Sequence, residues 1–318
     1  MELIGKVLVQ LVQLLLVLAL APLLTGYIRH LKARLLRRRG PAVVQPYRDL
    51  LKLIRKEVVL ADNASWLFRA APYIIFAATL IAASLVPTFA TGLVFSPAAD
   101  LIAIVALLGA ARFFLALAGL DVGTSFGGIG SSREMMIASL AEPAMLMFVF
   151  SLSLLAGSTQ LSSVADFMQR PEVGLRVSLA LSLVALIMVA IAENGRIPAD
   201  NPATHLELTM IHEAMILEYS GRHLAVIELA AYLKLLLYFS LIACVFVPWG
   251  LATAGEGFGA FAIGLGWYVA KLAVGGFLLA VFETGTAKMR VFRLSDFLGV
   301  ALMLGLLAAL LLFVSRGL

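Results

Sequence analysis

Residues 174–219 read GLRVSLALSLVALIMVAIAENGRIPADNPATHLELTMIHEAMILEY, and here an apolar run of membrane-spanning length leads directly into an acidic link. A carboxylate beside hydrocarbon is costly, and such groups usually mark an ion or proton route. Long apolar runs also flank this stretch on both sides. It therefore predicts a helical membrane protein whose titratable groups gather where spans meet. The carboxylates of the link are Glu193, Asp200, Glu207, Glu213 and Glu218.

The composition supports the same class. Of the 318 residues, 62% are hydrophobic and 14% are charged, whereas a soluble domain carries about 25% charged residues. The single cysteine, Cys244, lies inside an apolar run, which excludes a disulfide framework and a thiolate metal cluster. No iron–sulfur or haem attachment pattern occurs, so we expect no cofactor in this chain. We expect one integral membrane domain over residues 1–318.

Eight apolar segments predict eight transmembrane helices in an all-α bundle. Seventeen of the 24 lysine and arginine residues fall on alternate links between these segments. The positive-inside rule then places both termini outside and the four basic links in the cytoplasm. The first apolar segment lacks a small-residue cleavage site and predicts a retained span. The expected spans are residues 3–28, 71–91, 100–120, 136–157, 174–193, 226–248, 259–282 and 297–314.

Two of the basic links are long enough to hold helices of their own. In the first link (residues 29–70), the segment PYRDLLKLIRKEVV places apolar residues at helical spacing with charges on the other side. This pattern predicts an amphipathic helix, at the membrane surface or under a docked partner. In the fifth link (residues 194–223), Asn201 can cap a helix, Pro202 suits its first turn and Gly221 can end it.

The fifth-link helix would carry two rows of titratable side chains. Glu207 and Glu218 lie eleven residues apart, so they fall within about 20° of each other on one face. His205 and His212 likewise share a face, and Glu213 lies off the glutamate face. Carboxylates in an apolar setting, and histidines, can pass a proton near neutral pH. A solvated, charged helix is the alternative, but the many apolar residues on this helix favour packing and function.

A metal site formed by His205 and His212 is a further interpretation. It is disfavoured because two helical turns is a long spacing for ligands of one ion.

Charges also lie within or at the ends of the spans, and buried charges need partners. A single pair could serve only to fix the register of two helices. The set as a whole favours a polar axis that crosses half of the bilayer. The candidate pairs join Arg112 to Glu142 or Glu193, and Lys234 or Lys271 to Glu228 or Glu283.

The third link, GLDVGTSFGGIGSSREMM at residues 119–136, is rich in glycine and serine but lacks the spacing of a phosphate-binding loop. One interpretation is a flexible turn beside a capped helix. The other places Asp121, Glu134 and Glu142 on the approach to a proton route, beside a helix that Pro143 loosens. The first link lies at the membrane and lacks interleaved aromatic residues, which favours anionic lipid or a partner subunit over nucleic acid.

Several of these segments carry a resemblance to a known family. They are RRGPAVVQPYRDLLKLIRKE (residues 38–57), FFLALAGLDVGTSFGGIGSSREMM (113–136), and AENGRIPADNP (192–202) followed by LEYSG (217–221). Over nearly its whole length the chain resembles the H-type membrane subunits of respiratory complex I, which form one superfamily. It resembles more closely the related subunits of group 4 membrane-bound hydrogenases, the formate hydrogenlyase subunit 4 and hydrogenase-4 component C type. The third-link motif is the basis for that branch.

The resemblance implies eight spans, outside termini and a location in the bacterial inner membrane. It implies a subunit that is not catalytic alone and that anchors an electron-transfer arm and couples it to proton pumping. The implied partners are hydrogenase-like large and small subunits, a ferredoxin-like iron–sulfur subunit, antiporter-like membrane subunits and the lipid bilayer. The iron–sulfur clusters, and any nickel–iron site, would belong to the partners, and whether quinone binds stays open.

Residue patterns and the resemblance together give two sets of predicted site residues. The resemblance implies, by position, that the family's charged positions are occupied here by Glu193, Arg196, Asp200, Glu207 and Glu218. The predicted proton pathway comprises Glu142, Glu193, Asp200, His205, Glu207, His212, Glu213, Glu218, Glu228 and Lys234. The surface predicted for arm docking, or for a quinone-like cavity, comprises Arg38, Arg39, Gln45, Asp49, Lys52, Lys56, Glu57, Arg133 and Arg196.

The chain departs from the family pattern in three places. Ala203 and His205 stand where the family usually has glutamates, and Glu207 and Glu218 are further apart than usual, so His205 or His212 would substitute. The first-link motif is also shorter, which argues against an ordinary quinone cavity. The alternative function is that of the quinone-site, H-type subunit of NADH:quinone oxidoreductase (complex I). A stand-alone transporter would show an inverted repeat, and none occurs.

Overall fold

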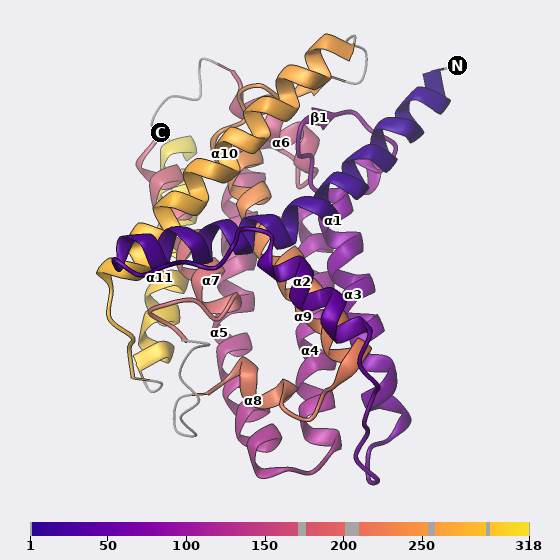
Figure 1. Ribbon diagram of the computed structural model, residues 1–318. Helices are drawn as coiled ribbons and strands as arrows, with labels where there is room; N and C mark the ends of the chain where they lie inside the picture. The colour runs from indigo at the N-terminus through magenta and orange to yellow at the C-terminus, as the bar shows by residue number, and fades with distance from the viewer. Residues whose placement is uncertain (1, 171–175, 201–209, 254–257, 291–292, 318) are drawn as a thin grey trace.

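The structure is a computed structural model that describes residues 2–170, 176–200, 210–253, 258–290 and 293–317. His205 and Glu207 lie outside the described residues. The described chain is helical apart from two short strands and the links (Figure 1). The elements are α1 (Glu2–Leu35), α2 (Gln45–Ile54), α3 (Trp66–Leu85), β1 (Ala90–Thr91), the 3-10 helix η1 (Ser96–Ala98), α4 (Leu101–Asp121), α5 (Ser125–Ala156), α6 (Leu161–Met168), α7 (Val177–Glu193), α8 (His212–Ile216), α9 (Gly221–Phe246), β2 (Ala252–Thr253), α10 (Phe258–Gly285) and α11 (Leu294–Gly317).

Seven helices in the described part of the chain are long and apolar enough to cross a membrane, namely α1, α3, α4, α5, α9, α10 and α11. The fifth expected span is α7, which is shorter, with 17 residues. At 1.5 Å per residue it is about 25 Å long, which is at the lower limit for crossing hydrocarbon. Figure 1 shows both termini towards the same end of the bundle, which agrees with the expected even number of spans when α7 is included. The predicted all-α membrane bundle is confirmed.

The links divide between two ends of the bundle (Figure 1). The end that carries the termini, here called the termini end, also holds α6 and the parallel pairing of β1 with β2. The opposite end, here called the α8 end, holds α8 and the links that join α2 to α3 and α4 to α5. These are the basic links of the sequence, so charge and architecture agree on which links share an end. That the α8 end faces the cytoplasm stays a prediction of the positive-inside rule.

Most of the glycine-rich third link forms the start of a helix, and the turn expected beside a capped helix is confined to residues 122–124. α5 begins at Ser125, well before the expected residue 136. Thr124 caps it, because its hydroxyl accepts a hydrogen bond from the Gly127 amide at 3.3 Å. This cap offsets part of the low helix propensity of the glycines. The remaining stabilisation comes from packing against α4 and α8.

The first link folds back along α1. Gly26 permits this approach, because a Cβ at that position would meet the carbonyl group of Val43. α2 then confirms the amphipathic helix predicted in this link, over a shorter range than residues 46–59. It buries Leu50 and leaves Leu51 exposed. An exposed apolar side chain on a basic helix fits contact with lipid or with a partner subunit.

The fifth link differs from the expected helix. Its described helix, α8, ends at Ile216, and residues 217–220 lead into α9 without helical structure. The reason lies in contacts with α3. Tyr219 stacks on Phe68 with ring centroids 3.9 Å apart, and its hydroxyl donates to the Phe68 carbonyl at 2.9 Å. The prediction of one continuous helix to Gly221 is therefore wrong, and Glu218 lies beyond the end of α8.

Packing between the spans gathers several helices around one region of the α8 end. α9 packs against α1, α2 and α3, and it is the most buried of the spans. α4 lies between α3 and α5, and α8 rests on both α4 and α5. α10 lies along α1, while α11 covers α5 and α7. Residues from α1, α4, α5, α7, α9 and α10 therefore meet near α8.

Candidate functional site

Arg112 of α4 lies at the centre of the site, with 6% of its surface exposed. Its Nη2 forms a close ion pair with Oε1 of Glu193, the last residue of α7. Nε of Arg112 lies 3.5 Å from Oε1 of Glu134 on α5. Nη1 lies 3.6 Å from Oε1 of Glu142 on the same helix. The predicted pairing of Arg112 with Glu142 or Glu193 is confirmed, since both pairs form.

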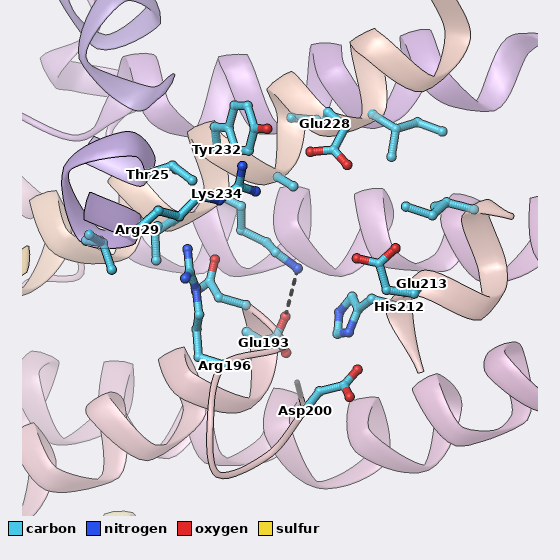
Figure 2. A pocket seen from close by; sticks show the side chains of 18 of the residues that line it. Thr25, Arg29, Glu193, Arg196, Asp200, His212, Glu213, Glu228, Tyr232 and Lys234 are labelled. Carbon is cyan, nitrogen blue, oxygen red and sulfur yellow. Dashed lines mark ion pairs between the residues drawn. The ribbon is translucent and has the colours of Figure 1, made fainter. Parts of the chain in front are cut away.

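Two more groups extend this cluster in opposite directions. Nζ of Lys234 on α9 lies 3.9 Å from Oε2 of Glu193, an ion pair that Figure 2 marks. Nε2 of His212 on α8 lies 3.5 Å from Oε2 of Glu134. Both carboxylates are 1% exposed. A row of ionisable groups therefore joins α9, α7, α4, α5 and α8. We call it the Arg112 cluster, consisting of Arg112, Glu134, Glu142, Glu193, His212 and Lys234.

A second cluster lies where α1 and α10 approach the fifth link. Nζ of Lys32 lies 2.9 Å from Oε2 of Glu283, and Nη1 of Arg196 lies 3.5 Å from Oε1 of the same carboxylate. Glu283 is 4% exposed. Burial lowers the pKa of Arg196 from its ordinary value, and the Glu283 carboxylate acts against that shift. Since the ordinary value is so high, the guanidinium stays charged at neutral pH. We call Lys32, Arg196 and Glu283 the Glu283 cluster.

The fifth link is also fastened to the residues that follow α10. Lys288 donates to Oδ1 of Asp200 at 3.1 Å. The Met289 amide donates to the Pro198 carbonyl at 3.0 Å. These contacts attach the described start of the fifth link to the residues after α10. No contact between these two segments was predicted from the sequence.

One expected set of pairs is wrong. It joined Lys234 or Lys271 to Glu228 or Glu283. Lys234 instead reaches Glu193, and Glu283 reaches α1 and the fifth link. Lys271 donates to the carbonyl of Trp249, after α9, at 2.6 Å. Spacing along the sequence showed which residues are charged but not which helices are neighbours.

Both clusters line a single cavity of about 510 Å³. Apolar side chains, among them Ile75, Leu108 and Ile227, form another part of its wall. Figure 2 shows Arg29 and Arg196 towards one side of the cavity and His212 and Glu213 towards the other. The described lining carries equal numbers of basic and acidic side chains. The basic ones are Arg29, Lys32, Arg38, Arg112, Arg196 and Lys234, and the acidic ones are Glu134, Glu193, Asp200, Glu213, Glu228 and Glu283.

The structure brings most of the described pathway candidates to this cavity. Those that line it are Glu193, Asp200, His212, Glu213, Glu228 and Lys234. Glu142 joins the cluster through its pair with Arg112. Glu218 is exposed and does not line the cavity. His205 and Glu207 lie outside the described residues, and so does the suggested metal pair of His205 with His212. Among the described residues, no group of three acidic, histidine or cysteine side chains is placed to hold a metal ion.

The docking candidates separate into cavity, helix and surface positions. Arg38 and Arg196 line the cavity. On α2, Gln45 donates to Oδ1 of Asp49 at 2.9 Å. Arg133 donates to the Met210 carbonyl at 2.7 Å, which ties α5 to the fifth link. The remaining candidates are exposed on the first link, namely Arg39, Lys52, Lys56 and Glu57.

The electrostatic setting of His212 favours its neutral form. Burial lowers the pKa of His212 from its ordinary value, and Lys234 and Arg112 act in the same direction. The carboxylates of Glu134 and Asp200 act in the opposite direction and reduce the shift. A neutral imidazole can donate a proton from one ring nitrogen and accept one on the other. His212 therefore has the chemistry of a proton relay.

Sequence reasoning left several members of the two clusters out of the predicted pathway. Arg112 is the only charged residue between 101 and 120, and this isolation was a usable signal. Glu134 and Glu283 were recognised as charges but were not assigned to the route. Arg29 and Lys32 were grouped with the basic first link, because α1 was expected to end near residue 28 and instead continues to Leu35.

Comparison with known proteins supports a common origin with respiratory membrane subunits. A family model described as NADH dehydrogenase matches residues 7–314. Formate hydrogenlyase subunit 4 of Escherichia coli (strain K12) is 36% identical over 286 residues, which cover 90% of this chain and 92% of that protein. Hydrogenase-4 component C of the same organism is 36% identical over 242 residues, which cover 76% of each chain. The expected family resemblance is confirmed.

A solved structure shares the fold. It is titled as the membrane-bound sulfane sulfur reductase, an archaeal respiratory membrane complex. One of its chains superposes with a TM-score of 0.80 at 18% identity, covering 97% of this chain and 99% of that one. At this identity the likeness concerns the fold alone, and it supports the description of a multi-pass membrane bundle.

Proposed function

The chain belongs to the NADH dehydrogenase family and is a membrane subunit of a respiratory-type complex, and from this premise we propose that it anchors and couples a hydrogenase-type oxidoreductase. It would link a hydrophilic electron-transfer arm to proton-pumping, antiporter-like membrane subunits. The iron–sulfur clusters, and a nickel–iron site where one is present, would reside in hydrogenase-like and ferredoxin-like partners. This chain would supply the ionisable groups that respond when electrons move in the arm.

The observation that carries the proposal is the Arg112 cluster. Its three carboxylates and its two cations, Arg112 and Lys234, leave one negative charge while His212 is neutral. Uptake of one proton, on His212 or on a carboxylate, brings the cluster to neutrality. Water compensates part of the Glu142 charge, since that side chain is 44% exposed, but the other members are buried and respond to any change of charge because an uncompensated buried charge is costly. The cluster can therefore hold a proton and release it when a nearby charge changes.

A route through the cluster follows from its contacts. A proton that enters the cavity at the α8 end reaches His212, which lies 3.5 Å from Oε2 of Glu134. Arg112 stays charged and carries no proton, but it pairs with both Glu134 and Glu193, so a proton on Glu134 weakens one of its ion pairs and changes its hold on the other carboxylate. Lys234 pairs with the second carboxylate oxygen of Glu193, Oε2. Protonation of Glu193 would weaken its ion pairs with Arg112 and Lys234, which frees both cations to shift towards other carboxylates. Proton movement is thereby coupled to movement of side chains on α4 and α9.

The first link supplies a surface on which the arm could dock. Arg39, Lys52 and Lys56 are exposed there, beside the exposed apolar residues Leu51 and Ile54 of α2. A basic rim around apolar side chains steers an acidic partner and then buries contact area. Arg38 lines the cavity from the same link, so docking and cavity are adjacent.

The experiment that tests the proposal replaces the central carboxylate with its amide. Glu193→Gln keeps the shape of the side chain and removes its titration. We expect the complex to assemble and to evolve hydrogen from reduced methyl viologen, while inverted membrane vesicles lose proton uptake measured with a fluorescent acridine dye. Glu218→Gln is the matched control, because Glu218 is exposed and outside the cavity. Normal proton uptake by Glu193→Gln would refute the coupling role.

A second candidate function is the quinone-site subunit of NADH:quinone oxidoreductase. The apolar part of the cavity wall supports it, since a quinone needs an apolar slot beside polar groups. Organic extraction of the purified complex distinguishes the two proposals. Bound quinone at a stoichiometric level, together with inhibition by quinone-site inhibitors, would favour this second function over the first.

A further inference from the structure

The glycines at the start of α5 bear directly on α8. A Cβ at Gly130 would lie 2.9 Å from Cβ of Ala214 and 3.0 Å from the carbonyl oxygen of Ile211. Real Cβ atoms essentially never show a contact as short as 2.9 Å, and 3.0 Å is tighter than nine in ten real contacts; neither neighbour is the end of a flexible side chain. Any side chain at position 130 would therefore push α8 away from α5.

The same contact continues onto α4. A Cβ at Gly119 would lie 2.6 Å from Oγ of Ser131 and 3.2 Å from Cβ of Met215. A Cβ at Gly127 would in turn meet the carbonyl group of Gly119. The end of α4, the start of α5 and the Ala214–Met215 part of α8 thus meet at glycines, where an added side chain would have no room. We call Gly119, Gly127 and Gly130 the glycine seat.

Polar contacts near the glycine seat fix the direction in which α8 lies. Arg133, one turn after Gly130 on α5, donates to the carbonyl of Met210 at 2.7 Å. Ser131 donates to the carbonyl of Ala116 at 2.8 Å, which ties α5 to α4. The approach of α8 is therefore defined by glycines that allow it and by hydrogen bonds that orient it.

The residue that follows Arg133 is Glu134, which is 1% exposed. Its Oε2 faces Nε2 of His212 at 3.5 Å, and within the described residues neither Oε2 nor either ring nitrogen of His212 forms a hydrogen bond. On the other side of the ring, a Cβ at Gly195 would lie 3.1 Å from Nδ1 of His212. The Glu134 carboxylate oxygen is therefore buried, forms no hydrogen bond in the described part of the chain and faces the imidazole of His212, which is confined on its other side by Gly195. This arrangement suits exchange of a proton between the two side chains.

We propose that Gly130 and Gly119 are positioning residues that seat α8 so that His212 and Glu134 exchange a proton. The proton leaves Nε2 of a protonated imidazole and binds Oε2 of the carboxylate, which leaves a neutral imidazole and a neutral acid. The proposal rests on the coupling function and assigns its entry step. The charged groups that surround His212 are Glu134 from α5, Lys234 from α9, Arg112 from α4, Asp200 from the fifth link and Glu213 from α8.

The rate of proton transfer between His212 and Glu134 should depend on the position of α8, and so on the glycine seat. Proton transfer needs heavy atoms within about 2.6–3.2 Å, or one bridging water. The resting separation of 3.5 Å is only slightly longer, so a small movement of the imidazole closes it. A methyl group at position 130 would push α8 away from α5 and so lengthen the distance between His212 and Glu134. A misplacement of about 1 Å can reduce a positioned reaction by as much as a hundredfold.

The test compares two identical substitutions in one helix. Gly130→Ala introduces the contact with Ala214, whereas Gly128→Ala is the control because nothing lies within 4 Å of a Cβ at Gly128. In inverted vesicles that contain the whole complex, we expect Gly130→Ala to reduce the rate of proton uptake about tenfold or more. Hydrogen evolution from reduced methyl viologen and the amount of assembled complex should stay near the wild-type level. Gly128→Ala should match wild type in all three measurements.

Rescue and epistasis separate positioning from a general loss of structure. Ala214→Gly removes the opposing atom, so the double variant Gly130→Ala/Ala214→Gly should recover most of the proton uptake. In a His212→Gln background, Gly130→Ala should cause no further loss, and the pH profile of uptake should be the same with and without it. Should Gly130→Ala assemble poorly, Ala214→Ser adds one atom from the other side of the same contact and should give a milder loss.

The outcomes also separate this inference from the coupling function. Normal uptake by Gly130→Ala together with lost uptake by Glu193→Gln would overturn the seat and leave the coupling function standing. Normal uptake by both variants would overturn both. A loss in Gly130→Ala that Ala214→Gly does not rescue, or that adds to the loss in His212→Gln, would overturn the seat because the glycine would not act through His212.

Discussion

The two ends of this bundle hold their helices together by different means. At the termini end, neutral side chains reach across to backbone carbonyls. Gln10 donates to the carbonyl of Ser84 at 3.2 Å and Gln13 to that of Val86 at 3.0 Å. At the α8 end, charged side chains pair with one another, around Arg112 and around Glu283. Neither glutamine can titrate, whereas almost every member of the second arrangement can change its charge or its partner.

Among the described residues, the buried atoms that form no hydrogen bond also differ in kind: at the termini end they include the neutral Oε1 of Gln13, and at the α8 end they belong mainly to titratable groups. At the α8 end, several buried atoms form no hydrogen bond within the described residues, including Oε2 of Glu134, Oε1 of Glu283 and both ring nitrogens of His212. A buried network that is only partly satisfied is a poor way to stabilise a fold. The comparison therefore indicates that the termini end is built for fixed helix positions and the α8 end for exchange of protons and partners.

The largest expected effect follows removal of the central cation. Arg112→Met leaves three carboxylates facing one another with only Lys234 to compensate them. Breaking a buried pair in this way costs about 3–5 kcal/mol, so we expect a large fall in the thermal stability of the purified complex and loss of proton uptake. Melting of the detergent-solubilised complex, followed by intrinsic fluorescence, measures the first and vesicle assays the second.

The control for this variant lies at the termini end. Lys271→Met removes one hydrogen bond to the Trp249 carbonyl, for which we expect a cost of about 0.5–1.5 kcal/mol and normal proton uptake. If Lys271→Met destabilised the complex as much as Arg112→Met does, the two ends would not differ in the way described above.

The Glu283 cluster should respond more weakly. Glu283→Gln leaves Lys32 and Arg196 without this carboxylate, and their side chains are 29% and 17% exposed, so water compensates part of the loss. We expect a destabilisation of about 1–3 kcal/mol, measured by the same melting experiment. A triple variant, Lys32→Met/Arg196→Met/Glu283→Leu, replaces all three charged groups by apolar ones and should recover much of the stability. If stability did not recover, the attraction between the charged groups would contribute more to stability than their desolvation costs.

Acid should affect the α8 end through His212. Burial lowers the pKa of His212, so the folded protein binds fewer protons there than the unfolded chain does. Stability therefore falls as the pH drops below the unfolded value of about 6.5. We expect the melting temperature to decline between about pH 7 and about pH 5.5, and His212→Gln to reduce that decline. An equal decline in both proteins would show that other groups determine the acid sensitivity.

The sequence predicted much of this architecture, because hydrophobic length and charge asymmetry act locally. The apolar runs predicted the spans, and the basic links predicted which ends of the helices share a side. The short α7 and the early start of α5 were not predicted, because both depend on neighbours. α5 includes the segment SFGGIGSS (residues 125–132) because α4 and α8 pack on glycines that alone are poor helix formers.

The sequence predicted which residues belong to the candidate site better than it predicted which of them contact one another. Glu193, Asp200, His212 and Lys234 were selected as charges beside hydrocarbon, and all of them line the cavity. Their partners depend on which helices are adjacent, and one sequence does not contain that information. The expected helix face for Glu218 was wrong for a similar reason, since Tyr219 stacks on Phe68 and ends the helical path before it.

The smallest expected effect returns to the termini end. Gln13→Leu keeps the volume of the side chain and removes its hydrogen bond to the Val86 carbonyl. The Oε1 atom of Gln13 has no hydrogen bond within the described residues, so the substitution also removes one unsatisfied acceptor. The two effects oppose each other, and we expect a net change in stability below about 1 kcal/mol. Proton uptake should be unchanged, because a glutamine side chain does not titrate.

The glutamine contacts of α1 provide the strictest test of the contrast between the two ends. Gln10→Leu, which removes the neighbouring contact with the Ser84 carbonyl, is the matched variant and should behave in the same way. If either substitution abolished proton uptake while the complex stayed assembled, a neutral contact far from the Arg112 cluster would be part of the mechanism. The division of the bundle into a structural end and a titrating end would then be wrong, because proton movement would depend on how α1 is held against the end of α3.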